Sequence, residues 1–310
     1  MHRHLLSLAK LEPEELFHLV DRGIAMKSLA PGMQPLKGRM VGIYFRKTST
    51  RTRTSFTVGA AKLGADVIAY GPNDLQLATG ETVQDTARVL SRFLDALVMR
   101  TAESLDEMRA FADQQRMAVV NAMADVEHPT QAIADLCTMK EHFGGLEGLD
   151  VLYLGEGNNT ATALALAMAQ LPRARLTLLT PPGYGVPPEV MEMARRRAGR
   201  TGAVVEERHA AAEPPRGVDV VYTTRWQTTG TTKADPDWMR TFAPFSVTAE
   251  LMAEVSGPRT VFMHDLPAKR GEDVAAEVLD GPRSIAWDQA EYKLYGAMSV
   301  LEWCILGPQG

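Results

Sequence analysis

Residues 40–70 read MVGIYFRKTSTRTRTSFTVGAAKLGADVIAY, and this stretch predicts a strand, a helix and a second strand in succession. Residues 40–45 form a short apolar run between polar neighbours, which is typical of a buried strand. Helical spacing follows over residues 50–63, and residues 66–70 are typical of the next strand. A strand, a crossover helix and a strand in this order are the building unit of a parallel sheet.

The same alternation continues on both sides of a glycine-rich break. Further strands are predicted at residues 96–99, 117–121, 150–154, 175–179, 218–223 and 261–264, and helices at residues 81–94, 105–114, 131–143, 161–171 and 188–200. Gly144, Gly145 and Gly148 interrupt the pattern, because glycine clusters end helices. We therefore expect an α/β fold of two doubly wound parallel-sheet domains, residues 1–145 and 146–288, with a C-terminal helix in residues 289–310 that packs back on the first domain.

The composition is that of a globular protein with a substantial core. The 310 residues are 45% hydrophobic and 23% charged, which excludes disorder as the dominant state. The net charge of −5 argues against nucleic-acid binding through bulk charge, although it allows a local basic pocket. No window approaches about 18 uninterrupted apolar residues, and no signal sequence is recognisable, so we expect a cytoplasmic protein without membrane contact.

The cysteines and histidines give no support to a metal site. Cys137 and Cys304 lie in apolar, helix-like segments, and we expect both to be buried thiols in a reducing compartment. The 7 histidines are scattered, and no spacing typical of metal ligands is present. The sequence therefore predicts neither a metal nor a cofactor.

The sharpest local feature lies between the first predicted strand and its helix. Residues 45–54, FRKTSTRTRT, combine three arginines, one lysine and five hydroxyl residues. A helix N-terminus offers free backbone N–H groups and a partial positive charge, so these neighbouring donors predict a site for a phosphate-type anion. Ser49 or Thr50 is the expected N-cap. The alternative is a solvated basic loop that only caps the helix.

Two other predicted strands bring polar residues to the same edge of the sheet. Arg100 follows one strand, and His128 and Gln131 follow the next. Ligands of open parallel sheets bind outside the carboxyl ends of the strands. We therefore expect Arg51, Arg100, His128 and Gln131 to line one crevice, although His128 alone would more often be a cap or a core residue.

Several motifs, taken together and in order, resemble those of the aspartate/ornithine carbamoyltransferase family. They are Ser49-Thr50-Arg51-Thr52-Arg53-Thr54-Ser55-Phe56, Arg100, His128-Pro129-Thr130-Gln131 and His264-x-Leu266-Pro267. Gly155-Glu156-Gly157-Asn158-Asn159 resembles the ornithine branch. The resemblance implies a two-domain enzyme, a homotrimer or a multiple of one with active sites between subunits. Its first domain would bind carbamoyl phosphate and its second an amino-acid-like amine.

The resemblance also assigns residues to carbamoyl phosphate binding: Ser49, Thr50, Arg51, Thr52, Gln76, Arg100, His128, Gln131, Leu266 and Lys293. The first four would hold the phosphate. Gln76 lies in the loop that in this family reaches a neighbouring subunit's site. Leu266 would offer a backbone carbonyl to the carbamoyl amide group. Lys293 stands where the family commonly has an arginine, and a lysine lacks the forked guanidinium.

These residue types fit carbamoyl transfer. An uncharged amine attacks the carbonyl carbon, and the charge that develops on the oxygen can be stabilised by hydrogen bonds from Arg100, His128 and the Thr52 hydroxyl. Phosphate then leaves, and Arg51 stabilises its growing charge. Arg51, Arg100 and His128 are therefore the predicted catalytic residues. The chemistry needs no protein nucleophile, metal or cofactor.

The second domain departs from the ornithine branch in its acceptor site. Asp265 stands where that branch has a cysteine, and Thr224 where it has an aspartate. Thr228 follows in a segment that no longer carries the branch's Ser-Met pair. Arg225 and Gln227 resemble residues of the aspartate branch that contact a substrate carboxylate. The acceptor site therefore differs from that of the ornithine branch at several positions.

These departures predict a carbamoyltransferase whose acceptor is an amino acid other than ornithine, such as a short diamino acid of specialised metabolism. Asp265 would pair with a substrate ammonium, and Asn158 and Asn159 would hydrogen-bond the acceptor. Thr224, Arg225, Gln227 and Thr228 complete the predicted acceptor site.

Four alternatives remain open. They are an ordinary ornithine carbamoyltransferase of arginine biosynthesis, an inactive binding paralogue, an NAD-dependent dehydrogenase and a two-lobed binding protein. Residues 150–161 resemble a dinucleotide-binding turn, but the following strand ends at Thr180 and Pro181 without the acidic residue that such a site needs.

Overall fold

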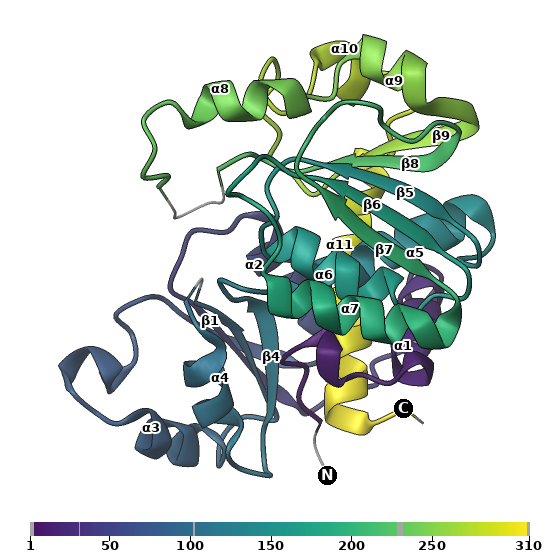
Figure 1. Cartoon of the computed structure of the whole chain (residues 1–310). Helices are drawn as coiled ribbons and strands as arrows, with labels where there is room; N and C mark the ends of the chain where they lie inside the picture. Colours follow the sequence, from purple (N-terminus) through teal and green to yellow (C-terminus); the bar gives the residue numbers. More distant parts are fainter. Residues whose placement is uncertain (1–2, 31, 102, 228–231, 309–310) are drawn as a thin grey trace. The chain divides into compact units, whose positions relative to one another are not determined.

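The computed structural model describes residues 3–30, 32–101, 103–227 and 232–308, and its contacts divide the chain into two compact units. The first unit contains residues 1–137 and 291–310, and the second contains residues 138–290. Each unit is built on one parallel sheet (Figure 1). The predicted α/β fold with two doubly wound parallel sheets is therefore confirmed.

The sheet of the first unit has the order β2-β1-β3-β4, with all three pairs parallel. Its strands are β1 (Met40–Phe45), β2 (Asp66–Tyr70), β3 (Ala96–Arg100) and β4 (Ala118–Met123). The chain adds β2 on one side of β1 and then β3 on the other. The order of the strands thus reverses between β1 and β3, where parallel sheets leave a crevice at their carboxyl ends.

Helices cover both faces of this sheet because β1, β3 and β4 are apolar almost throughout. Tyr44, Leu97 and Met99 form one core with residues of α3 (Val83–Leu90) and α4 (Leu105–Ala112). Alternate strand residues such as Ile43 and Val98 are also fully buried and point to the opposite face. The remaining helices of this unit are α1 (Pro13–Met26), α2 (Arg51–Lys62) and the short η1 (Leu8–Lys10) and η2 (Gln76–Thr79).

Two long helices carry the chain between the units: α5 (Pro129–Phe143) and α11 (Ala286–Leu306). The C-terminal part of α11 packs back on the first unit as predicted. Ser299 Oγ donates to the Leu19 carbonyl at 2.7 Å, and Glu302 forms an ion pair with Arg22.

Cys137 and Cys304 are both buried free thiols, which confirms that prediction. No helix in the described ranges is long and apolar enough to cross a membrane.

The sheet of the second unit has the order β7-β6-β5-β8-β9, again with every pair parallel. Its strands are β5 (Asp150–Leu154), β6 (Arg175–Leu179), β7 (Val204–Arg208), β8 (Val218–Thr223) and β9 (Ser256–His264). Its helices are α6 (Asn159–Met168), α7 (Pro188–Thr201), α8 (Trp238–Phe242), α9 (Ala249–Val255) and α10 (Ala276–Leu279), with the short η3 (Ala243–Phe245). The strand order reverses between β5 and β8.

The sequence pattern does not predict β7, because this edge strand is polar and only partly buried.

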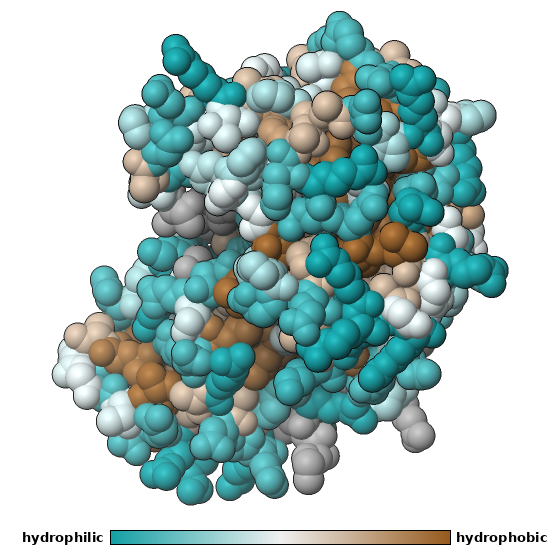
Figure 2. Space-filling model, viewed as in Figure 1, coloured by the Kyte–Doolittle hydropathy of each residue, from teal (hydrophilic) through white to brown (hydrophobic). Residues whose placement is uncertain are grey.

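Apolar side chains are exposed near α3. Figure 2 shows a group of brown residues at the lower left, near the region where Figure 1 places α3. The exposed apolar side chains of this part of the chain are Val89 and Phe93, with 46% and 68% of their surface accessible. Exposed apolar patches commonly mark interaction surfaces.

The turn between β5 and α6 depends on close backbone packing at Gly157. Its N–H donates to the Tyr184 carbonyl at 2.7 Å. A Cβ at this position would lie 2.1 Å from the Val186 nitrogen and 2.2 Å from the Gly185 carbonyl carbon. Only glycine therefore fits without moving backbone.

We predict that Gly157→Ala lowers the free energy of unfolding by about 3 kcal/mol, because backbone atoms must shift to admit a methyl group. Urea unfolding measures this change. Gly199→Ala is the matched control: it lies inside α7 with nothing within 4 Å of its Cβ. The control should raise stability by about 0.5–1 kcal/mol. Equal unfolding free energies for the two variants would contradict the packing argument.

Candidate active site

The first polar cluster lies at the carboxyl ends of β1 and β3. Phe45 and Arg100 are register partners, and the Arg46 N–H donates to the Arg100 carbonyl at 3.0 Å. The loop rich in arginine and hydroxyl groups therefore leaves the sheet beside Arg100. Arg100 Nη1 is 3.5 Å from Thr52 Oγ1, and both residues are buried, with 7% and 4% accessible surface. Arg100 therefore lies against the first turn of α2.

The N-terminus of α2 gives this cluster its positive potential. The helix starts at Arg51, and its first turn contains no acidic residue that would neutralise the helix dipole. Thr50 occupies the N-cap position, but its backbone is helical and its side chain makes no capping hydrogen bond. Thr50 is therefore the N-cap by position, as expected, although its side chain does not cap the helix. The first-turn N–H groups are suited to bind an anion.

His128 and Gln131 are buried at the start of α5, with 4% and 1% accessible surface. The Gln131 amide donates to Asp135 Oδ1 at 2.8 Å and accepts a hydrogen bond from Lys293 Nζ. Burial lowers the pKa of His128 well below its ordinary value, and the positive charges of Lys293 and Arg100 lower it further. The imidazole is therefore neutral at pH 7.

The charges of Arg100 and Lys293 act on His128, and Lys293 bonds to Gln131, so these four residues belong to one cluster of the first unit.

Gln76 lies apart from this cluster. Its side chain is exposed on η2 and accepts a hydrogen bond from Thr79 Oγ1 at 2.5 Å. Within the described residues, no contact joins Gln76 to this cluster.

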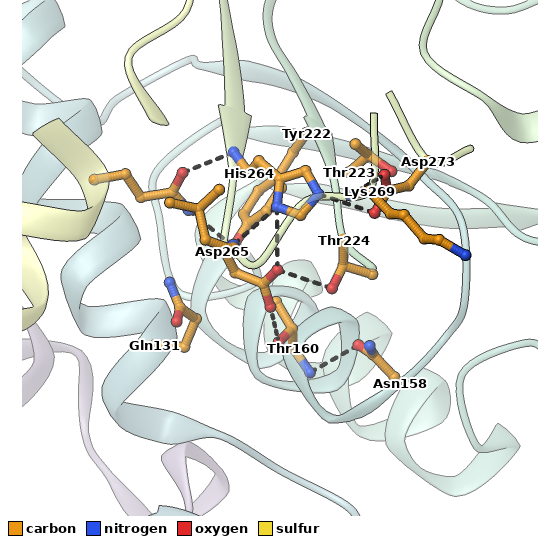
Figure 3. A network of polar contacts seen from close by, with 12 residues as sticks. Gln131, Asn158, Thr160, Tyr222, Thr223, Thr224, His264, Asp265, Lys269 and Asp273 are labelled. Atoms are coloured by element: carbon orange, nitrogen blue, oxygen red, sulfur yellow. Dashed lines mark hydrogen bonds and ion pairs between the residues drawn. The ribbon is translucent and has the colours of Figure 1, made fainter. Parts of the chain in front are cut away.

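The second polar cluster lies at the carboxyl ends of β8 and β9 and the start of α6, and it centres on Asp265 (Figure 3). Thr160 Oγ1 donates to one carboxylate oxygen at 2.8 Å, and Thr224 Oγ1 donates to the other at 2.9 Å. Both threonines have 2% accessible surface, whereas the Asp265 side chain keeps 13%. Thr160 is missing from the sequence-based site, although its place just after Asn158 and Asn159 could have suggested it.

His264 supports the turn that carries Asp265. The imidazole is fully buried, and its Nδ1 accepts from the Leu266 N–H at 2.8 Å. Its Nε2 faces Asp273 Oδ2 at 3.3 Å, and the Asp273 Oδ1 accepts from the Lys269 N–H at 2.8 Å. Leu266 packs against the core of the second unit. These contacts hold the turn between β9 and Leu266 in place.

The other predicted acceptor residues are placed differently. Asn158 caps α6, because its Oδ1 accepts from the N–H groups of Thr160 and Ala161 at 3.0 and 3.2 Å. Asn159 is buried in the first turn of the same helix. Arg225 and Gln227 line a small cavity together with Trp226 and Trp238. Thr228 lies outside the described residues.

The structure bears on one of the earlier alternatives, the NAD-dependent dehydrogenase. In a dinucleotide site the glycine turn after the first strand faces a pyrophosphate. Here the backbone of Gly185 and Val186 covers Gly157 instead, which argues against such a site. Within the ranges described, no group of three or more His, Cys, Asp or Glu side chains is arranged to hold a metal ion.

Comparison with known proteins gives two domain-level matches. The model described as "Aspartate/ornithine carbamoyltransferase, carbamoyl-P binding domain" matches residues 3–141. The model described as "Aspartate/ornithine carbamoyltransferase, Asp/Orn binding domain" matches residues 147–304. The two polar clusters thus fall in domains whose described ligands differ.

Individual proteins match over nearly the whole chain. The ornithine carbamoyltransferase of Methanothermobacter thermautotrophicus is 38% identical over 301 residues, covering 97% of this chain and 98% of that protein. The one from Symbiobacterium thermophilum is 40% identical over 302 residues, covering 96% of each chain. The solved ornithine carbamoyltransferase of Pyrococcus furiosus superposes with a TM-score of 0.92 at 35% identity, covering 99% of this chain and 97% of that one. The chain therefore belongs to the aspartate/ornithine carbamoyltransferase family of enzymes.

Proposed function

We propose that this enzyme transfers the carbamoyl group of carbamoyl phosphate to the side-chain amine of ornithine, giving citrulline and phosphate. The observation that carries the proposal is the carboxylate of Asp265, which Thr160 and Thr224 hold at the acceptor end. The relatives compared above are named ornithine carbamoyltransferase, and none of them supports a different acceptor. The sequence-based preference for a non-standard acceptor therefore gives way to its first alternative.

The first cluster fits the role of binding carbamoyl phosphate. The N–H groups at the start of α2, the Arg51 guanidinium and the hydroxyls of Ser49, Thr50 and Thr52 are donors for the phosphate oxygens. Their positive potential also stabilises phosphate as the leaving group. This assignment explains why the helix starts with arginine where most helices favour an acidic first turn.

The carbamoyl end would lie against Arg100 and His128. As the amine nitrogen bonds to the carbonyl carbon, electrons move onto the carbonyl oxygen, and Arg100 and neutral His128 can donate hydrogen bonds to it. Each such donor contributes about 3 kcal/mol to lowering the barrier. The carbon–oxygen bond to phosphate then breaks, and the proton lost by the amine is taken up by phosphate or solvent. Gln131 Oε1, oriented by Lys293, has a second lone pair for the carbamoyl NH₂ group.

Asp265 can preserve an acidic acceptor site even though Thr224 has replaced the expected aspartate. Thr224 Oγ1 is 2.9 Å from Asp265 Oδ1. The negative charge therefore lies at the end of β9, whereas the family usually has it at the end of the neighbouring strand β8. Each carboxylate oxygen accepts one hydroxyl and keeps a lone pair for a substrate ammonium group. An ornithine site is therefore compatible with both substitutions.

A short diamino acid is the second candidate. The observation in its favour is that Asp265 stands where the ornithine branch has the smaller cysteine. Removal of one methylene changes discrimination by about 10–200-fold in a fitted pocket, so the two candidates are readily separated.

We predict that ornithine gives the highest kcat/KM in a panel with 2,4-diaminobutyrate, 2,3-diaminopropionate, lysine and aspartate, by about tenfold or more. Phosphate release and carbamoylated product should be measured in the same reaction and should be equimolar. A higher kcat/KM for a shorter diamino acid would establish the second candidate. Binding of carbamoyl phosphate without turnover of any amine would identify an inactive paralogue.

The same assay should be run on Asp265→Asn. Loss of the carboxylate removes an ion pair from a largely buried site, which should raise the KM for ornithine about 30-fold or more and leave the KM for carbamoyl phosphate within about twofold. Asp280→Asn is the matched control, because Asp280 pairs with Arg270 on the exposed surface of the same unit. Equal effects of the two variants would remove Asp265 from the acceptor site.

The neutral state of His128 predicts a pH dependence of stability. Burial and two nearby cations lower its pKa in the folded state, so the unfolded chain binds the proton more tightly. The stability associated with His128 is therefore present above the unfolded pKa of about 6.5 and is lost as the pH falls through it. Between about pH 7.5 and about pH 5.5, the wild type should lose about 1.4 kcal/mol more than His128→Gln.

Urea unfolding of both proteins at the two pH values measures this difference. All other titrating groups are common to the pair and cancel in the comparison. If the two proteins lose stability in parallel, or if the variant loses more, His128 is not held neutral by the fold.

A further inference from the structure

We propose that Lys233 is a positioning residue for the acceptor site. Its ammonium group lies inside an aromatic cage as a buried cation and fixes the side chain of Glu156. The inference rests on the proposed acceptor chemistry of the second unit, and it concerns residues that the sequence motifs leave unassigned. The aromatic cage consists of Tyr184, Trp238 and Phe242.

The side chain of Lys233 is almost completely enclosed. Only 4% of its surface is accessible, and its Nζ lies 2.5 Å from Glu156 Oε1. The same Nζ is 4.7 Å from the ring centroid of Tyr184, 5.5 Å from that of Trp238 and 4.6 Å from that of Phe242. Lysines usually extend into water, so a carboxylate and three rings around one ammonium group indicate a built site.

The energetics favour one fixed arrangement. Burial of an ammonium group is strongly unfavourable unless it is paired, and removal of one partner leaves the other charge uncompensated. The rings also pack on one another, with centroids 4.8 Å apart for Tyr184 and Phe242 and 5.5 Å apart for Trp238 and Phe242. The Lys233 cation therefore ties its own segment to the turn that carries Glu156.

That turn belongs to the acceptor cluster. Glu156 precedes Gly157 and Asn158, and Asn158 caps the helix whose Thr160 holds Asp265. The Glu156 carbonyl also accepts from the Tyr153 hydroxyl at 2.7 Å. The backbone of Glu156 is thus held from β5 while its side chain is held by Lys233. Displacement of this turn would move the start of α6 and its hydrogen bond to Asp265.

The cage also reaches the segment after β8. Trp226 packs on Phe242 with ring centroids 5.6 Å apart, and it lies two residues beyond Thr224. The two threonines that donate to Asp265 therefore belong to segments that both touch the cage. Lys233 belongs to the second unit and the phosphate-binding cluster to the first, so we expect its loss to affect the two substrates unequally.

The test compares Lys233→Met, Lys233→Arg and the exposed control Lys37→Met in steady-state assays with both substrates. Lys233→Met should raise the KM for the acceptor about tenfold or more and leave the KM for carbamoyl phosphate within about twofold. Lys233→Arg should recover most of the acceptor affinity, because guanidinium retains the charge for Glu156 and stacks on aromatic rings. Lys37→Met should match the wild type.

A fall in melting temperature with equal changes in both KM values would show a merely structural role and overturn the proposal, as would unchanged kinetics in Lys233→Met. If that variant does not fold, Glu156→Gln replaces it, because it removes the same ion pair and leaves the cage in place. Glu156→Gln should then show the same selective rise in acceptor KM, and its absence would contradict the proposal.

Tryptophan fluorescence separates this inference from the proposed function. If the wild type fails to turn over ornithine, the proposed function fails, but Lys233→Met should still shift the emission and increase acrylamide quenching, since the cation contacts Trp238. Emission and quenching identical to the wild type would contradict the cage itself.

Discussion

The reversal of strand order in each parallel sheet is the constraint from which the polar clusters follow. In the first unit the chain turns back beside β1, and in the second it turns back beside β5. Connections on the two sides of such a strand diverge, so the carboxyl ends there remain uncovered. The helices that begin at these points, α2 and α6, present their N-termini where the neighbouring strands end. Side chains far apart in sequence are therefore gathered without any dedicated insertion.

The side chains at the two points of reversal carry opposite charge. In the first unit burial and the charges of Lys293 and Arg100 keep His128 neutral. Arg51 at the start of α2 adds positive charge, which suits an anion. In the second unit a single carboxylate, Asp265, takes two hydroxyl donors and retains partial exposure. An acyl phosphate and an ammonium group need these opposite environments. The chemistry proposed for the enzyme is thus a consequence of where each sheet reverses and which residues follow its strands.

Much of the fold could be predicted because the strands of parallel sheets are short apolar runs separated by helices. The edge strand β7 and the short helices α8 to α10 could not, since their segments lack a clear period and their positions depend on tertiary packing. The basic cluster could also be predicted, because its residues follow the strands directly. The position of Gln76, by contrast, depends on η2, where its side chain is exposed and accepts a hydrogen bond from Thr79.

The acceptor site shows what a residue-by-residue comparison of a sequence leaves out. Thr224 and Asp265 each depart from the ornithine branch, and taken separately they predict a changed acceptor. Their hydrogen bond across 41 positions indicates instead that a carboxylate can move to a neighbouring strand end and serve the same region. Lys233 gave no signal at all, because an isolated lysine in a polar segment normally lies in water. Only its enclosure by three rings reveals it.

The central claim is that the first cluster binds the phosphoryl end of the substrate pair and Asp265 binds an ammonium group of the acceptor. A crystal structure with a bisubstrate phosphonate analogue built on ornithine tests it most directly. The account predicts phosphonate oxygens within hydrogen-bond distance of Arg51 and the first turn of α2, and an ammonium nitrogen within that distance of Asp265. A ligand amino group that lies elsewhere, with Asp265 bonded only to Thr160 and Thr224, would contradict it.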